Sequence, residues 1–167
     1  MEIPQKVLVI CYGNICRSPV AEYMLKYYLK NSTISALKSI EIRSAGLDPS
    51  FREMSLNSQR YLEKKNIGLD IQKFSSTKIS KDLVQESDII YVLEQYMKDT
   101  IISRFGKNNI EESNFLKNGK VQTLSEGASL SGDVEDPYGM DYHGYEVILD
   151  KINNLCKQIV KNWEIIA

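Results

Sequence analysis

The sequence predicts an α/β fold in which helices alternate with the strands of a parallel sheet. Two short runs, 6–10 (KVLVI) and 88–93 (DIIYVL), are apolar without alternation, which is typical of strands buried on both faces. A third observation is an apolar stripe at steps of three and four residues between Tyr145 and Trp163, which predicts a long helix. Strands that alternate with helices favour right-handed crossovers and therefore a parallel sheet.

Composition bounds the class of protein. The chain has 167 residues without a repeat, linker or low-complexity tract, so we expect a single domain over residues 1–167. Its 21 basic and 22 acidic residues nearly balance, which argues against nucleic acid or an anionic membrane as a partner. No apolar run reaches the roughly 18–20 residues of a membrane span. The chain has three cysteines, which is an odd number and too few for a disulfide scaffold. We therefore expect a reducing environment and a cytoplasmic location.

The first half of the chain predicts two strands and two helices. The strand at 6–10 leads into the loop CYGNICRS, and Ser18-Pro19 is typical of a helix N-cap followed by a first-turn proline, so we expect a helix over 19–29. A second strand is expected at 40–44 (IEIRS). A helix is expected over 54–66, with an apolar side formed by Leu56, Tyr61 and Leu62.

The second half continues the alternation. A short helix begins at Ser80, the buried strand follows at 88–93, and a helix over 96–105 ends at Gly106. The polar segment 107–119 is expected to be a surface excursion. A fourth, weak strand is expected at 121–124, before the long C-terminal helix.

The loop CYGNICRS (11–18) carries the chemistry. It follows the first strand, and open parallel sheets bind ligands beyond the carboxyl ends of their strands. Gly13 and Asn14 allow a backbone curl that turns N–H groups inward near a positive helix end, and Arg17 adds a planar fork for two phosphate oxygens. The same field favours the thiolate of Cys11. We therefore predict Cys11 as a nucleophile beneath a bound phosphate.

Other phosphate and cysteine motifs fit less well. There is no GK[ST], so ATP or GTP hydrolysis is a poor interpretation. Four residues separate Cys11 from Cys16, which is not the spacing of a C-x-x-C redox or zinc motif, so no metal is expected. The bland alternative is that Cys11 is a core cysteine and Arg17 a surface charge.

The segment 134–139 (VEDPYG) supplies a candidate acid. Transfer of a phosphoryl group from oxygen needs a proton for the leaving group. Pro137 fixes the local backbone, and Asp136 precedes it in an extended or turn conformation. Asp-Pro is also an ordinary turn dipeptide. The phosphoryl transfer predicted for the loop needs a proton donor, and this favours Asp136 as the general acid.

Four stretches resemble the low-molecular-weight protein tyrosine phosphatase family: 7–22 (VLVICYGNICRSPVAE), 42–46 (IRSAG), 88–95 (DIIYVLEQ) and 135–139 (EDPYG). They occur in the family's order over nearly the whole chain. The resemblance implies a three-layer α/β/α sandwich with a four-stranded parallel sheet in the order 2-1-3-4. It also implies a monomer without metal or organic cofactor. Its partners would be phosphotyrosine-containing proteins, with inorganic phosphate or other oxyanions as inhibitors.

The resemblance also implies residue roles. Cys11 would form a phosphocysteine, Arg17 would bind phosphate and stabilise the transition state, and Asp136 would protonate the leaving oxygen and then activate water. Ser44 would support the loop together with Asn14 and Ser18, and Ser18 would ease departure of the thiolate. The substrate-binding residues would be Tyr12, Gly13, Asn14, Ile15, Cys16, Ser18 and Tyr138.

Some positions depart from the family pattern or keep two interpretations. Cys16 would form a reversible disulfide with Cys11 or would simply pack. Tyr12 would add an aromatic wall or narrow the slot, and Phe51 is a displaced candidate for an aromatic that stacks on the substrate. Glu94 stands where the family has aspartate, with an effect that the sequence does not reveal.

Three alternatives to a tyrosine phosphatase remain open. Protein arginine phosphatases share the fold, and 131–152 resembles that branch, but Ile15 replaces its threonine and favours an apolar phenyl ring over a guanidinium. An arsenate reductase needs a further cysteine pair, whereas Cys156 lies on the apolar stripe of the last helix. A non-catalytic phosphoprotein-binding module is disfavoured because Cys11, Arg17 and Asp136 are all present.

Overall fold

The structure, a computed structural model, describes residues 2–68, 70–107 and 110–167. Its sheet contains β1 (Lys6–Cys11), β2 (Glu41–Gly46), β3 (Ile89–Val92) and β4 (Val121–Thr123). All neighbouring strands are parallel, in the order β2-β1-β3-β4. The predicted four-stranded parallel sheet and its strand order are therefore confirmed.

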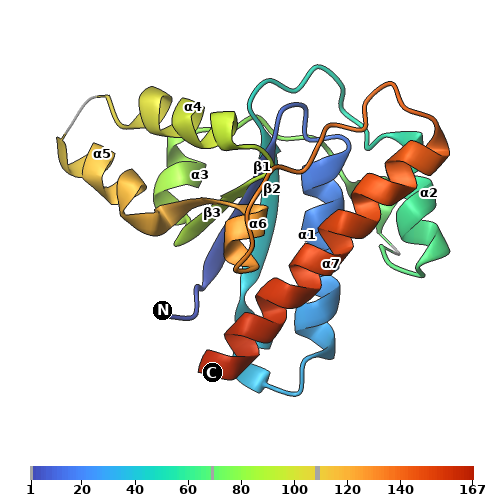
Figure 1. Ribbon diagram of the computed structural model, residues 1–167, viewed down its shortest axis with the longest axis horizontal. Helices are drawn as coiled ribbons and strands as arrows, with labels where there is room; N and C mark the ends of the chain where they lie inside the picture. Colours follow the sequence, from blue (N-terminus) through green and yellow to red (C-terminus); the bar gives the residue numbers. More distant parts are fainter. Residues whose placement is uncertain (1, 69, 108–109) are drawn as a thin grey trace.

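Helices cover both faces of this sheet. They are α1 (Arg17–Asn31), α2 (Leu56–Lys64), α3 (Lys81–Glu86), α4 (Gln95–Phe105), α5 (Ile110–Phe115), α6 (Leu124–Gly127) and α7 (Tyr142–Ile166). Short turns of 3-10 helix (Ser35–Ser39 and Ile71–Lys73) and of π-helix (Leu116–Lys120) join them. Figure 1 shows α1, α2 and α7 on one side of the sheet and α3, α4 and α5 on the other. None of the described helices is long and apolar enough to cross a membrane.

The core forms where the sequence patterns predict it. The β1 residues from Val7 to Cys11 are all buried, as expected of a central strand covered by helices on both faces. The apolar stripe of α7 packs against α1, and Asp141 caps α7 by accepting a hydrogen bond from the Gly144 N–H at 2.8 Å. These contacts hold the carboxyl ends of β1 and β2 at a fixed place between two helix layers.

Three local expectations were wrong. Helix α1 begins at Arg17, so Ser18 is not its N-cap and its hydroxyl is available for other contacts. Leu124 begins α6 instead of ending β4, because Thr123 forms a capping box with Glu126. Leu56 is 81% exposed and does not belong to the apolar side of α2, which Tyr61 and Leu62 form.

The polar segment 107–119 lies at the surface as expected, because its residues with described burial are exposed except Leu116. It contains α5 and a following π-helical turn, which departs from helical geometry at Asn118 and Gly119. The chain returns to the core at Leu116, which is buried.

Candidate active site

A cavity of about 190 Å³ opens at the carboxyl ends of the strands. Figure 1 shows the loops after β1 and β2 and the segment before α7 gathered at this end of the molecule, away from both termini. The lining residues predicted from the sequence are Cys11, Tyr12, Gly13, Ile15, Cys16, Arg17, Asp136 and Tyr138. Phe51, the displaced aromatic candidate, also lines the cavity, together with Asp48 and Ser50 from the same loop after β2. The predicted Asn14, Ser18 and Ser44 do not line the cavity but lie buried behind it.

The loop curls around the sulfur of Cys11. Asn14 adopts a left-handed conformation with φ of +52°, which brings its backbone N–H to within 3.2 Å of Cys11 Sγ. Ser18 Oγ lies 3.0 Å from the same sulfur. Ser18 Oγ accepts a hydrogen bond from the Asn14 amide, and it has two neighbouring acceptors for its own proton, the sulfur and the Ala45 carbonyl oxygen at 3.4 Å. The Asn14 N–H, together with the Ser18 hydroxyl when it donates to Sγ, stabilises a thiolate there.

Behind the loop, the side chain of Asn14 forms three hydrogen bonds. Its Nδ2 donates to Ser18 Oγ and Ser44 Oγ, both at 2.9 Å, and its Oδ1 accepts from the Thr77 N–H at 2.9 Å. Ser44 in turn donates to Glu22 Oε2 at 2.5 Å. The predicted trio therefore forms one network, in which Thr77 and Glu22 take part as well.

The end of β2 can approach this loop only because it is a glycine. A Cβ added to Gly46 would lie 2.8 Å from the carbonyl oxygen of Tyr12 and 3.0 Å from the Asn14 N. A larger residue would push the loop away from its position around Cys11.

Arg17 is held from below by fixed acceptors. The residue is only 1% exposed, and its Nη1 donates to Glu94 Oε1 at 2.5 Å and to the Val134 carbonyl at 2.7 Å. Its Nη2 lies 3.3 Å from Asp136 Oδ2. Burial acts to lower the pKa of Arg17, but the negative charges of Cys11, Glu94 and Asp136 outweigh it and raise the pKa. Arg17 therefore remains a cation at the base of the cavity.

Asp136 lies at the mouth of the cavity with 47% of its side chain exposed. Its Oδ1 accepts a hydrogen bond from the backbone N–H of Tyr138 at 3.1 Å, which is an Asx turn across Pro137. One carboxylate oxygen thus points to Arg17 while the other is engaged with its own loop.

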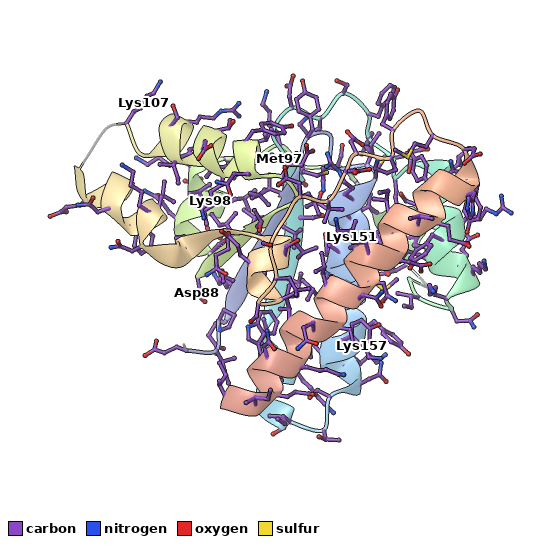
Figure 2. The ribbon with its side chains drawn as sticks, in the orientation of Figure 1. Asp88, Met97, Lys98, Lys107, Lys151 and Lys157 are labelled. Atoms are coloured by element: carbon purple, nitrogen blue, oxygen red, sulfur yellow. The ribbon has the colours of Figure 1, made fainter. Side chains whose placement is uncertain are left out.

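The segment before Asp136 is fixed at several points. The Val134 N–H donates to the Leu93 carbonyl at 2.8 Å, and Asp133 Oδ1 accepts from the Gln95 N–H at the start of α4 at 2.8 Å. Lys151, labelled on α7 in Figure 2, donates to the Asp133 carbonyl at 2.6 Å. The candidate acid is therefore carried on a segment tied to β3, α4 and α7.

Three aromatic side chains surround the opening. Tyr12, Phe51 and Tyr138 come from three different loops and are all largely exposed. Tyr12 therefore contributes to the wall of the cavity, and Phe51 reaches it despite its displaced position in the sequence. A narrow cavity with a thiol and a guanidinium at its base and aromatic rings at its rim has room for a flat apolar ring.

Cys16 has a buried thiol with a partner from the last helix. Its Sγ lies 3.3 Å from the Tyr145 hydroxyl, and burial raises its pKa. All three cysteines are free thiols. Cys156 is buried in the core beside α1, where its Sγ lies 3.7 Å from the Ala21 carbonyl, and burial raises its pKa as well.

Six residues of this site were given no role by the sequence: Asp48 and Ser50, which line the cavity, and Glu22, Thr77, Glu94 and Tyr145, which lie behind or beside it. Glu94 lies two residues after the end of β3, which is next to β1 in the sheet, so the rule that ligand-site residues follow parallel strands points to it. Glu22 ends the stretch 7–22 that resembles the family and accepts a hydrogen bond from Ser44. Thr77 contacts the loop through its backbone N–H and Tyr145 contacts it from a distant helix, and no local pattern marks these two residues. Within residues 2–68, 70–107 and 110–167, no three His, Cys, Asp or Glu side chains gather as a metal site would require.

A family model described as low molecular weight phosphotyrosine protein phosphatase matches residues 6–164. The chain belongs to this family. The predicted family and the predicted class of enzyme, a cysteine-dependent phosphatase, are therefore confirmed.

Individual relatives divide between two activities. A protein-arginine-phosphatase of Bacillus subtilis (strain 168) is 28% identical over 157 residues, which cover 93% of this chain and 94% of the relative. A low molecular weight protein-tyrosine-phosphatase, Ptp, of Acinetobacter johnsonii is 28% identical over 159 residues, covering 95% of each chain. The crystal structure of a YwlE mutant from Bacillus subtilis superposes with a TM-score of 0.80 at 26% identity, covering 96% of this chain and 99% of that one.

Proposed function

We propose that this phosphatase hydrolyses phosphotyrosine in proteins through a phosphocysteine intermediate. The observation that carries the proposal is the shape and chemistry of the cavity. Cys11 and Arg17 lie at its base, while Tyr12, Phe51 and Tyr138 surround the mouth with aromatic rings. When the phosphate of a phosphotyrosine binds at the loop, the phenyl ring of that side chain lies between these aromatic walls. The ring is uncharged, so it needs no polar partner from the walls.

The first step transfers the phosphoryl group to the protein. The Cys11 thiolate attacks phosphorus, and the bond from phosphorus to the tyrosine oxygen breaks. Asp136 in its acid form donates a proton to that oxygen, so tyrosine leaves as a neutral phenol. Arg17 and the inward N–H groups of the loop stabilise the charge on the equatorial oxygens.

The second step releases phosphate. The Asp136 carboxylate accepts a proton from water as the water oxygen attacks phosphorus of the phosphocysteine. The sulfur–phosphorus bond breaks, inorganic phosphate leaves and Cys11 returns to a thiolate that Ser18 Oγ stabilises at 3.0 Å. Asp136 then carries the proton needed for the next cycle.

The second candidate is a protein arginine phosphatase. The two named relatives are equally similar to this chain, so overall identity does not discriminate between the activities. Ile15 favours phosphotyrosine, because it lines the cavity with an aliphatic side chain that offers no hydrogen bond to a guanidinium. The contribution of Ile15 is testable by itself: Ile15→Thr should lower activity on phosphotyrosine and raise activity on phosphoarginine.

Location, assembly and inhibition are part of the same proposal. We propose a monomer that works in the cytoplasm, where a reducing environment keeps Cys11 and Cys16 as thiols. Inorganic phosphate and other tetrahedral oxyanions should bind the loop and compete with substrate. Size-exclusion chromatography and competition by phosphate test these statements.

A side-by-side hydrolysis assay tests the substrate. One peptide carries phosphotyrosine and a matched peptide carries phosphoarginine, with Cys11→Ser as the blank. Faster phosphotyrosine hydrolysis that disappears in the blank supports the proposal. Faster phosphoarginine hydrolysis would keep Cys11 as the nucleophile and Arg17 as the phosphate-binding residue. It would assign the chain to the arginine phosphatase branch of the family.

A further inference from the structure

A second hollow adjoins the candidate active site and has no role in the mechanism above. It measures about 450 Å³ and is lined by Tyr12, Asp48, Lys78, Tyr96, Thr100 and Arg104, with Leu47 at its floor. We call it the Arg104 groove. Tyr12 and Asp48 line both the groove and the active-site cavity, so the groove is within reach of residues that flank a phosphorylated side chain in the cavity.

The groove is rigidly connected to the nucleophile. The Leu47 N–H donates to the Cys11 carbonyl at 3.0 Å, and the Leu47 carbonyl accepts a hydrogen bond from Arg104 Nη1 at 3.3 Å. The Asp48 N–H donates to the Tyr12 carbonyl at 3.0 Å. Two backbone bonds therefore fix the position of the groove relative to the catalytic loop, as a subsite for a neighbouring substrate residue requires.

Charge decides what the groove accepts. Lys78 and Arg104 are the cations of its lining, and Asp48 is the acid. Asp48 Oδ1 pairs with Lys78 Nζ at 3.3 Å, whereas Arg104 forms no ion pair with a carboxylate of the described residues. A guanidinium has five N–H donors, and the hydrogen bond to the Leu47 carbonyl uses one of the five donors of Arg104. The groove therefore offers an uncompensated cation with free donors.

The remaining lining residues suit a short side chain. The rings of Tyr12 and Tyr96 are about half exposed and give the groove aromatic walls against which methylene groups pack. The Thr100 hydroxyl donates to the Tyr96 carbonyl at 2.8 Å and is thus already engaged. Aromatic walls beside a planar cation fit the methylenes and carboxylate of a glutamate or aspartate.

We propose that the Arg104 groove binds an acidic side chain of the substrate protein close to the phosphorylated residue, and that Arg104 determines this preference. The proposal rests on the proposed function, because it assumes that the cavity takes a phosphorylated side chain of a peptide. It names the substrate class more narrowly, as phosphotyrosine segments with a neighbouring Glu or Asp.

The test compares matched phosphotyrosine peptides that carry Glu or Gln at one of the three positions before or after the phosphotyrosine. For the position that reaches the groove, the wild type should have kcat/KM about 3- to 5-fold higher for Glu than for Gln, the scale of a partly exposed charge-assisted contact. Arg104→Met should bring this ratio to about 1, and Arg104→Lys should keep part of it. At about 0.5 M salt the wild-type preference should weaken, because the charges are screened.

Controls separate specificity from damage. Lys157→Met removes one positive charge from α7, far from the groove (Figure 2), and should leave the Glu-to-Gln ratio unchanged. Hydrolysis of p-nitrophenyl phosphate, which has no flanking residues, should be unaffected in Arg104→Met. If no position shows a preference in the wild type, or if Arg104→Met lowers activity on Glu, Gln and p-nitrophenyl substrates alike, the proposal is overturned.

Failure of the proposed function gives a different result. If only phosphoarginine peptides are hydrolysed, the tyrosine assignment is wrong and the same Glu and Gln comparison is made on phosphoarginine peptides. A ratio that depends on Arg104 there would retain the groove and reject only the phosphotyrosine substrate.

Discussion

Replacement of Glu94 tests how Arg17 is held. Glu94 accepts the shortest hydrogen bond of Arg17, at 2.5 Å, and its side chain is 23% exposed while Arg17 is buried. Glu94→Ala would leave a buried cation with only the Val134 carbonyl and the longer contact to Asp136. Removal of one partner from a fully buried ion pair costs about 3–5 kcal/mol, and we reduce this to about 3 kcal/mol because Glu94 is partly exposed.

The loss should be visible in stability and in catalysis. A decrease of about 3 kcal/mol in the free energy of unfolding corresponds to a melting temperature about 6–12 °C lower for a chain of this size. An unanchored guanidinium should also lower kcat/KM for p-nitrophenyl phosphate by about 10- to 100-fold, because displacement of a positioning group by about 1 Å has effects on that scale. Urea unfolding and steady-state kinetics measure the two quantities.

Two further variants make the result specific. Glu94→Gln keeps an oxygen acceptor but no charge and should fall between the wild type and Glu94→Ala. Glu63→Ala removes an exposed acid from α2 and should change neither quantity. Glu94 adds no side-chain cap to α4, so loss of helix capping does not account for the effect. If Glu94→Ala unfolds within about 0.5 kcal/mol of the wild type and retains its kcat/KM, Arg17 does not depend on Glu94 and our reasoning is refuted.

Four other outcomes are expected. Asp136→Asn should lower kcat by about 10²- to 10⁴-fold while inorganic phosphate still competes, as measured by inhibition kinetics; unchanged kcat would exclude it as the acid. Asn14→Ala removes three buried hydrogen bonds and should lower the free energy of unfolding by about 3 kcal/mol in urea titrations. Gly127→Ala places a Cβ 2.4 Å from Cε1 of Tyr91 and should destabilise, with partial rescue by Tyr91→Leu. Burial lowers the pKa of Lys120 from 10.5 to about 8, so between these pH values the unfolded chain binds more protons than the folded chain. The free energy of unfolding, measured by urea titration, should therefore rise with pH over this range. Lys120→Met should abolish this part of the rise.

The catalytic loop could be predicted from the sequence because it is local. Cys11, Asn14 and Arg17 lie within seven consecutive residues between a buried strand and a helix, and the strand, the loop and the helix each restrict the backbone independently. Gly46 is also marked by local sequence, because it is the last residue of a strand that pairs with β1. The sheet order also follows from the family resemblance and the alternation of elements.

What could not be predicted depends on contacts between distant parts of the chain. Thr77 contacts Asn14 through a backbone N–H, so any residue type other than proline would supply the same donor. Tyr145 reaches Cys16 from a helix that begins 126 residues later, and its spacing on the apolar stripe marks it only as a core residue. Ser18 was expected to cap α1 because Ser-Pro is a typical helix start. In the structure the Ser18 hydroxyl instead contacts the sulfur of Cys11, and the rules for helix capping do not predict such a contact.

The contacts of Arg17 explain how an acidic surrounding is compatible with phosphate binding. Nη1 is occupied by Glu94 and the Val134 carbonyl, so neither contact uses the nitrogen that faces Asp136. Among the residues that the structure describes, Nη2 has its contact with Asp136, at 3.3 Å. A phosphate oxygen can replace this longer contact, and Asp136 is then free to turn toward the leaving oxygen. Glu94 therefore fixes the orientation of the guanidinium, while Asp136 occupies the side of it that substrate requires. This division of the two nitrogens requires Glu94→Ala to weaken binding of inorganic phosphate, whereas Asp136→Ala should not.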